Sequence, residues 1–461
     1  MTRIAVLTPL PPTRSGVAHY SSLVVPALGA TAFETLEDYR REDYDEVIYQ
    51  LGNNPHHELM YREAMREPGV AVLHDLVLHH LIVELTLARG DAEGYIAALE
   101  ASHGPAGAAW ARGRAAGLHS EMGNFLLPAS VEVAQRSKSV IVHNQYAKER
   151  LLSFGVTTPI HVVPHPYVPE TRTFDRTALR ARLGFTPADR VIGFFGFLTS
   201  AKRAEVVLQT FQAANDPRLK LLIVGEPAPN IDVKSLQGEG IVLTGYVADD
   251  DFPSYYAAAD RFVNLRYPSA GETSGTLIRA FDAGKPVAVS DYAQFAELPD
   301  EIVFKVPFDR EQERLLEFFT ADLPSPADAQ RRWLEQNATL DRCVEGYQRA
   351  LSDTAPVTGN AQPATIPLFP ELTIQRTETG LALTNRGTST IRTRTYGQPE
   401  YRLIAQVVRE GRVVDDRWLA LPCDLRPGAT ATIDYTPRAE GTLRLYHALQ
   451  DVPIVEVTDV R

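Results

Sequence analysis

Residues Arg261–Asp291, RFVNLRYPSAGETSGTLIRAFDAGKPVAVSD, hold a strand, a polar glycine-bearing loop, a helix and a second strand in one short run. The first strand is predicted over Arg261–Leu265, an apolar run bounded by turn residues. The helix is predicted over Thr276–Ala283, where apolar residues share one face, and it ends at Gly284 because Pro286 cannot continue it. The stretch is therefore a βαβ unit with a candidate ligand loop.

The loop between strand and helix is Gly271-Glu272-Thr273-Ser274-Gly275. At a helix start the backbone N–H groups lack partners and the helix dipole favours an anion, so a phosphate is expected there. Glu272 would repel a phosphate and is expected instead to accept hydrogen bonds from sugar hydroxyls. The alternative from these residues alone is a helix cap with a solvated Glu272.

Length and composition indicate a multidomain globular protein. The 461 residues suffice for about three domains of ~150 residues. Hydrophobic content of 44% and charged content of 23% are ordinary for globular chains. No apolar run reaches the ~18 residues that a membrane-spanning helix needs, and the opening MTRIAVLTPL is typical of a strand. A cytoplasmic location is the expectation.

Charge and cysteine content exclude several kinds of site. A net charge of −12 argues against broad binding of nucleic acid, which needs a basic surface. Cys343 and Cys423 fall in different predicted domains, and no cysteine pair has metal-ligand spacing. We expect neither a disulfide nor a zinc site.

The first third of the chain alternates strands with helical segments, which predicts a parallel sheet covered on both faces. The predicted strands are Arg3–Thr8, Glu46–Leu51, Val70–His74, Ser139–His143 and Ile160–Val163. Residues Arg89–Pro128 interrupt this order with Ala-rich helical segments. They are expected to form an insertion that packs on the domain, with the shaping of an acceptor pocket as the alternative.

Two positions in this first domain are candidates for ligand binding. Gly16 follows a Pro-rich loop at a predicted helix start, where it would admit a ligand close to the backbone or else make a tight turn. His74 follows a strand at the carboxyl edge of the sheet, where open α/β sheets place their ligands. His79 and His80 lie nearby and are weaker candidates, since a lone histidine is more often structural.

A second series of strands and helices begins after a boundary near Pro169. Its predicted elements are strands Arg190–Phe195, Leu219–Val224 and Gly240–Thr244, helices Arg203–Ala214 and Asp251–Ala258, and the unit described first. An amphipathic helix over Arg331–Ala350 is expected to close this half. Two doubly wound domains facing across a cleft would hold a ligand between them.

The first loop of this second half ends in two cations. Gly196-Phe197-Leu198-Thr199-Ser200-Ala201-Lys202-Arg203 follows a strand and leads into a helix. Lys202 and Arg203 at a helix start would match a diphosphate, whereas the alternative is a solvated basic pair.

The last quarter of the chain has a different sequence pattern from the two predicted α/β domains. Residues 353–365 are polar and contain proline, as a flexible linker does. Residues 366–461 carry short alternating strands with turns at Glu410-Gly411 and Pro427-Gly428, which predict a small β-sandwich.

Five blocks in order resemble the family 4 retaining glycosyltransferases of the GT-B fold, from Arg3 to about Ala350. They are PLPPTRSGVAHYS, VVPHPYV, GFLTSAKR, LLIVGE with GYVADDDFPSYYAAADRFV, and GETSGTLIRAFDAGKPVAVSD. The β-rich tail is similar to Ig-like modules of some bacterial glycan-biosynthesis enzymes through LRPGATATIDYTPRAEGTLRLYHAL. The resemblance implies domains at 1–168 for the acceptor and 169–352 for a nucleotide sugar, and no required metal.

The resemblance also implies roles for single residues. Lys202 and Arg203 would neutralise the donor diphosphate, Glu272 would contact the sugar, and His74 would lie near the reacting sugar. The remaining implied donor-binding residues are Gly16, Gly196, Thr273, Ser274, Gly275 and Arg279.

Two positions depart from the pattern of that family. Phe197 stands where the family usually carries Arg, and Arg279 stands where a second Glu usually holds the ribose. Glu272 matches the first Glu of the pattern when one residue is deleted after Gly275. An arginine has no acceptor for ribose hydroxyls, so either the donor, its binding or the activity is changed.

The resulting hypothesis is a cytoplasmic retaining glycosyltransferase, working at a membrane face, that uses a nucleoside diphosphate sugar and a glycan or lipid-linked acceptor. Glu272, Lys202 and Arg203 persist together, which favours an active enzyme. The alternatives are a nucleotide-sugar epimerase on the same fold and a catalytically silent glycan-binding or scaffold protein. The sequence predicts no oligomeric state.

Overall fold

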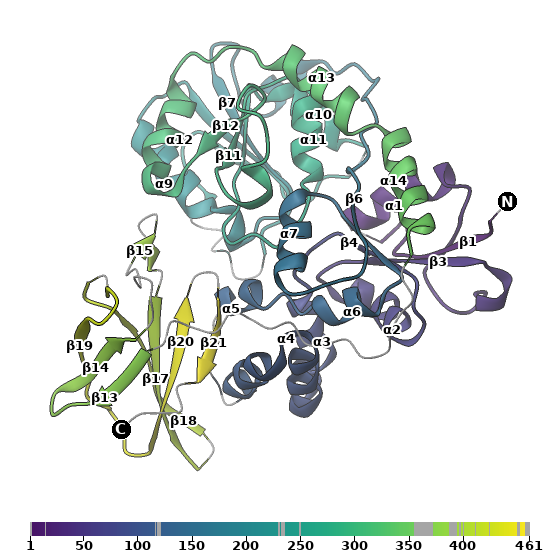
Figure 1. The fold of residues 1–461 in the computed structure, drawn as a ribbon. Coiled ribbons are helices and arrows are strands. Elements are labelled where there is room, and N and C mark those ends of the chain that lie inside the picture. The colour runs from purple at the N-terminus through teal and green to yellow at the C-terminus, as the bar shows by residue number, and fades with distance from the viewer. Residues whose placement is uncertain are drawn as a thin grey trace.

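The computed structural model shows two α/β domains and a β domain (Figure 1). The residues that it describes are 2–13, 15–115, 117, 121–228, 231, 236–248, 250–354, 372–386, 394–395, 398–399, 401–410, 412–423, 425–449 and 452–456. The linker expected over 353–365 lies outside the described residues from position 355 onward.

The first domain is built on a parallel sheet with the order β2-β1-β3-β4-β5-β6 in the described residues. The strands are β1 Ile4–Leu7, β2 Thr31–Phe33, β3 Glu46–Leu51, β4 Val70–Leu73, β5 Ser139–Val142 and β6 Ile160–Val162. The five predicted strands are each found to within one residue at either end. Strand β2 was not predicted, because three half-exposed residues at a sheet edge leave no apolar run.

Helices cover both faces of this sheet. They are α1 Gly16–Ala27, α2 Glu58–Arg66, α3 His79–Leu85, α4 Ala92–Ala115, α5 Glu121–Leu126, α6 Val131–Arg136 and α7 Gln145–Ser153. The insertion predicted over Arg89–Pro128 is formed by α4 and α5, and α4 bends at Gly104, where φ is 64° ahead of Pro105. Tyr95, Leu99 and Trp110 of α4 are fully buried, so the insertion packs as a second small core.

The second domain repeats the architecture with strand order β12-β11-β10-β7-β8-β9 in its described part. Its strands are β7 Arg190–Phe195, β8 Leu219–Val224, β9 Ile241–Leu243, β10 Arg261–Asn264, β11 Val287–Ser290 and β12 Phe304–Val306. Its helices are α8 Arg176–Arg182, α9 Ala204–Ala214, α10 Phe252–Ala258, α11 Gly275–Asp282, α12 Glu311–Thr320 and α13 Ala327–Asn337. The pairings between these named strands are all parallel, and apolar clusters lie on both faces, as a doubly wound sheet requires.

The prediction of a single helix over Arg331–Ala350 is wrong. Two helices occupy this region, α13 and α14 (Leu340–Ser352), and Thr339 caps the second by accepting from the N–H of Arg342. Helix α14 returns to the first domain and lies beside α1 (Figure 1), where the hydroxyls of Tyr347 and Tyr20 are 2.9 Å apart. Amphipathicity reveals that a helix has a buried face, but it does not reveal which domain buries it.

The β domain consists of two antiparallel sheets that share one core, as the predicted sandwich does. One sheet contains β13 Leu372–Arg376, β14 Gly380–Asn385 and β19 Thr430–Asp434; the other contains β17 Tyr401–Arg409, β18 Arg412–Ala420, β20 Thr442–Leu449 and β21 Val452–Glu456. A short pair, β15 Arg394–Thr395 and β16 Gln398–Pro399, stands apart. Ile374 and Leu383 of the first sheet meet Leu403 and Leu445 of the second in the buried core. Gly411 of the predicted hairpin lies outside the described residues.

The β domain docks on the helical insertion of the first domain. Strand β21 packs against α4 and α5 (Figure 1), and Ile404 of β17 is buried in the same cluster as Tyr95 and Trp110. The tail is therefore joined to the first domain by an apolar contact as well as by the chain.

Two further findings concern the cysteines and membrane-spanning segments. Cys343 is buried and Cys423 exposed, and both are free thiols. No helix in the described part of the chain is long and apolar enough to cross a membrane.

The contact through Ile404 yields a stability prediction. Ile404→Asp places an unpaired charge in an apolar cluster, so we expect a lower melting temperature and faster proteolytic release of the β domain. The matched control is Val414→Asp, since Val414 lies on the neighbouring strand with 38% of its surface exposed. Equal behaviour of the two variants would show that the docking contact contributes nothing.

Candidate functional site

The two α/β domains meet at the carboxyl ends of their strands. The loop of residues 267–274, which joins β10 to α11, touches the first domain: the N–H of Val77 donates to the carbonyl of Ala270 at 3.1 Å. The side-chain amide of Asn144 donates to the carbonyl of Gly271 at 2.8 Å. We call this contact region the interdomain seam, and it is where open α/β sheets bind ligands.

Helix α11 begins at the seam with an anion-favouring end. Ser274 is the N-cap, its hydroxyl accepting from the N–H of Leu277, and the same hydroxyl lies 2.9 Å from that of Thr276. The N–H groups of Gly275 and Thr276 have no acceptor among the described residues. The helix predicted from Thr276 begins one residue earlier, at Gly275, and its two unpaired donors point where the dipole favours negative charge.

Lys202 lies beside this helix start. Its side chain is 8% exposed, and Nζ donates to the carbonyl of Phe195 at 2.9 Å. A Cβ on Gly196 would lie 2.7 Å from Nζ and 3.3 Å from Cγ2 of Thr276, so the absence of a side chain at Gly196 makes room for the amine. Burial, and then the charge of Arg266, hold the pKa of Lys202 well below its usual value. No carboxylate pairs with it in the described residues.

Arg203 has a different environment from its neighbour. Its backbone is left-handed, with φ of 62°, and its guanidinium forms a two-pronged ion pair with Glu311 of α12. The guanidinium also lies 5.8 Å from the ring centre of Tyr267. Glu311 thus already neutralises the charge that the sequence assigned to a diphosphate, and that role stays a prediction for Arg203.

Glu272 is held within its own loop. Oε1 accepts from Nε of Arg266 at 2.7 Å, and Oε2 accepts from the N–H of Ala270 at 3.0 Å. Gln294 donates to the carbonyl of Glu272 at 2.9 Å. Arg266, buried at the end of β10, was missed by sequence reasoning because an arginine after a strand has no local signature. The carboxylate keeps part of its surface exposed at the seam, and Thr273 beside it does the same.

His74 belongs to a hydrogen-bonded network below the seam. Its Nε2 lies 2.6 Å from Oε1 of Gln50, and its Nδ1 lies 3.2 Å from Nε2 of His143. Burial, and then His143, hold the pKa of His74 well below its usual value, so the ring is neutral. Tyr20 lies edge-on at 4.7 Å between ring centres. Both ring nitrogens are engaged within the first domain, so His74 is held in one orientation.

The other two histidines of this group are structural or peripheral. His79 is fully buried, with Nδ1 at 2.6 Å from the carbonyl of Leu127 and Nε2 at 2.6 Å from the hydroxyl of Tyr95. His80 is exposed. The lower weight given to both from the sequence fits these surroundings.

Asp75, directly after His74, is a carboxyl at the seam that the sequence reading left without a role. The N–H of Asn53 donates to Oδ2 at 2.8 Å. Burial, and then the charge of Glu272 from the second domain, raise the pKa of Asp75 to about 7, while Arg266 opposes this shift.

Helix α1, which begins at Gly16, approaches Arg279 of α11 from the opposite domain. Gly16 begins α1 behind the N-cap Ser15, and a Cβ there would meet no atom within 4 Å. One turn later, His19 of α1 places Nε2 at 3.4 Å from a guanidinium nitrogen of Arg279 in α11. The guanidinium also lies 5.4 Å from the ring centre of Phe252.

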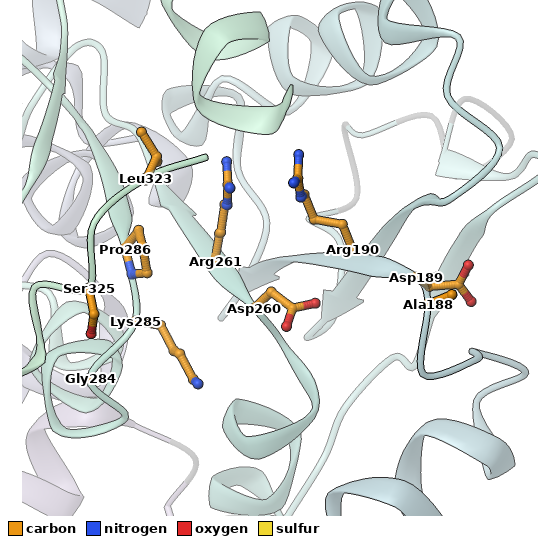
Figure 2. Close-up of a pocket in the computed structure, with 10 residues that line it drawn as sticks. All are labelled: Ala188, Asp189, Arg190, Asp260, Arg261, Gly284, Lys285, Pro286, Leu323 and Ser325. Atoms are coloured by element: carbon orange, nitrogen blue, oxygen red, sulfur yellow. The ribbon is translucent and has the colours of Figure 1, made fainter. Parts of the chain in front are cut away.

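A cavity of 380 Å³ lies at the opposite, amino-terminal edge of the second sheet (Figure 2). Arg190 and Arg261 point the same way there, and both donate to carbonyls at the end of α12. These arginines therefore cap a helix end, where cations are favoured, and the cavity is remote from the seam. No group of three metal-ligating side chains occurs among the described residues.

Comparison with known proteins agrees with this architecture. Residues 189–313 match the family model described as Glycosyl transferases group 1. A solved structure, Anabaena Alr3699/HepE in complex with UDP-glucose, superposes with a TM-score of 0.54 at 17% identity, covering 76% of this chain and all of that one. The two domains have the GT-B fold.

Curated relatives of this GT-B protein share parts of its sequence. D-inositol 3-phosphate glycosyltransferase of Mycolicibacterium gilvum is 28% identical over 253 residues, which cover 48% of this chain and 54% of the relative. Mannosylfructose-phosphate synthase of Agrobacterium fabrum is 32% identical over 179 residues, covering 33% of this chain and 37% of the relative. The GT-B chain thus spans about half the length of the first relative or less. Membership of family 4 and the Ig-like character of the tail stay predictions.

The carboxyl of Asp75 makes stability depend on pH. An unfolded Asp has a pKa of about 3.9, so between pH ~4 and ~7 the folded state binds more protons and loses stability as pH rises. We expect Asp75→Asn to raise the melting temperature of the protein, and the gain to grow from pH 4 to pH 8.

The control for this measurement is Asp322→Asn, because the side chain of Asp322 is fully exposed. If the melting temperatures of Asp75→Asn and of the wild type changed with pH in the same way between pH 4 and pH 8, the raised pKa of Asp75 would be contradicted.

Proposed function

We propose that the chain is a retaining glycosyltransferase that moves a sugar from a nucleoside diphosphate sugar to a glycan or lipid-linked acceptor without a metal ion. The observation that carries this proposal is that Lys202 lies beside the unpaired N–H groups at the start of α11, next to the first domain. The amine has no carboxylate partner in the described residues, and the arrangement suits a diphosphate that spans the two domains.

In this proposal the protein stabilises the leaving group. Negative charge develops on the diphosphate as its bond to the sugar breaks, and Lys202 with the N–H groups of Gly275 and Thr276 stabilises that charge. These groups supply the positive charge that a metal ion supplies in other transferases.

Glu272 orients the sugar in the same proposal. Arg266 and the N–H of Ala270 hold its two oxygens in place, so the remaining acceptor capacity of the carboxylate is directed at sugar hydroxyls. His74, neutral and held by Gln50 and His143, offers a polar wall on the acceptor side. Transfer with retention then proceeds without attack by a protein carboxylate.

The named relatives support the donor and acceptor classes. The superposed Anabaena structure holds UDP-glucose, and a further relative, 24% identical over 166 residues covering 32% of this chain, is an alpha-monoglucosyldiacylglycerol synthase from Streptococcus pneumoniae. For this chain we propose a cytoplasmic location, in contact with the inner membrane face where lipid-linked acceptors reside.

Calorimetry with UDP, GDP and ADP tests the donor site. We expect saturable binding of one nucleotide with and without a chelator, and a loss on the order of tenfold or more in Lys202→Ala. Because the pKa of Lys202 is held low, a bound diphosphate raises it, so binding takes up protons and weakens as pH increases.

Proton uptake is measured at pH 8 in two buffers of different ionisation enthalpy. It is expected to vanish in Lys202→Ala, and proton-neutral binding by the wild type together with undiminished binding by Lys202→Ala would show that Lys202 does not contact the diphosphate.

Glu272→Gln separates the enzyme from a silent scaffold. We expect sugar transfer to fall on the order of 100-fold while nucleotide binding persists, because the contact to the sugar is weakened and the contacts to the diphosphate are kept. The melting temperature is expected to fall, since Gln leaves the buried Arg266 without its counter-ion. Glu313→Gln is the control, since its carboxyl is 68% exposed on α12. Full transfer activity in Glu272→Gln would sink the assignment of the sugar site.

A further inference from the structure

Arg279 is a cation whose charge the first domain does not neutralise. It lies one helical turn after Gly275 on α11, so the two positions share a face. The partners of its guanidinium are Nε2 of His19 at 3.4 Å and the ring of Phe252 at 5.4 Å. Among the described residues no carboxylate lies within ion-pair distance of it.

The described surroundings of Arg279 supply no negative charge. His165, from the segment that joins the two domains, places Nε2 3.9 Å from the Cβ position of Gly275. Burial, followed by His143, lowers the pKa of His165 to about 3, and both His19 and Arg279 add to the shift. A half-buried guanidinium beside two imidazoles and a helix start is unfavourable until an anion joins it.

The same helix start has an unsatisfied donor. Asn264, 5% exposed at the end of β10, accepts from the hydroxyl of Ser274 through Oδ1, while its Nδ2 has no partner in the described part of the chain. Together with the N–H groups of Gly275 and Thr276, this amide makes the place rich in donors and poor in acceptors.

The two helix starts are arranged alike. Gly16 and His19 stand one turn apart on α1, and Gly275 and Arg279 stand one turn apart on α11. The contact between His19 and Arg279 brings the two faces together across the seam. Arg203, the cation assigned from the sequence, is occupied by Glu311, whose side chain is buried.

We propose that Arg279, with His19, completes an anion site whose other half is Lys202 and the start of α11, and that this site holds a diphosphate group. The inference rests on the proposed function for the identity of the ligand as a nucleoside diphosphate. It reassigns the second phosphate cation from Arg203 to Arg279. Since an arginine offers no acceptor, affinity comes from the phosphates and the ribose hydroxyls add little.

The test uses the full chain and calorimetry with the best-binding nucleoside diphosphate, its parent nucleoside and inorganic pyrophosphate. Arg279→Gln is expected to weaken the diphosphate and pyrophosphate on the order of tenfold or more and to leave the nucleoside unchanged. Arg279→Lys, which keeps the charge, is expected to recover part of the loss. Arg310→Gln is the control, because that side chain is 57% exposed and pairs with Glu313 on the surface.

Each other result has a definite meaning. Equal weakening of nucleoside and diphosphate by Arg279→Gln places Arg279 on the ribose or base and overturns the inference. Suppose that Arg279→Gln binds pyrophosphate as tightly as the wild type, while the double variant Arg203→Gln/Glu311→Gln binds it weakly. Arg203, and not Arg279, is then the second phosphate cation. If the wild type binds pyrophosphate but none of the nucleotides, the anion site is supported and the proposed function is contradicted. If it binds neither pyrophosphate nor a nucleotide, both the anion site and the proposed function are contradicted.

Discussion

The loop before α11 is the constraint on which the site depends. Its carbonyls at Ala270 and Gly271 accept hydrogen bonds from Val77 and Asn144 of the first domain, so the start of α11 is fixed against the other sheet. A Cβ on Gly271 would lie 2.7 Å from Cβ of Leu76, and φ of 73° there favours glycine as well. The two domains therefore touch through the backbone of this loop, and side chains from both domains lie close to it at the interdomain seam.

The distribution of charge along the seam follows from which cations already have partners. Arg266 is paired with Glu272, and Arg203 is paired with Glu311. Lys202 and Arg279 have no carboxylate among the described residues. Burial without a counter-ion disfavours the charged form of a side chain, which is why the pKa of Lys202 is held low. In the function proposed above, a diphosphate supplies the missing negative charge. The ion pairs Arg266–Glu272 and Arg203–Glu311 have a different role, because they hold loops and helices in place.

Much of the fold follows from local patterns. Short apolar runs, glycine and proline punctuation and one-sided helices predicted most strands of both α/β domains and helices α9, α10 and α11 to within a few residues, because these periods are set by backbone geometry. Strand β12 and helices α8 and α12 were not predicted. Two further exceptions involve distant partners. Strand β2 is too short to leave a pattern, and the apolar face of α14, with Tyr347, is buried by the first domain although the helix follows the second. Contacts between remote segments leave no period in the sequence.

The sequence by itself determined the βαβ units, a helix start within one residue of Gly275, the place of Lys202 in the loop after β7 and the presence of a separate β-rich tail. Tertiary structure alone decided which charges stay free. Lys202 and Arg203 are adjacent, yet the left-handed backbone at Arg203 sends its guanidinium to Glu311 while Lys202 turns beneath Gly196. Likewise Arg279 meets His19 only because two helix starts face each other. The physical reason is that a side chain's ionic partner depends on folding in space, whereas its helix or strand depends chiefly on its neighbours in the chain.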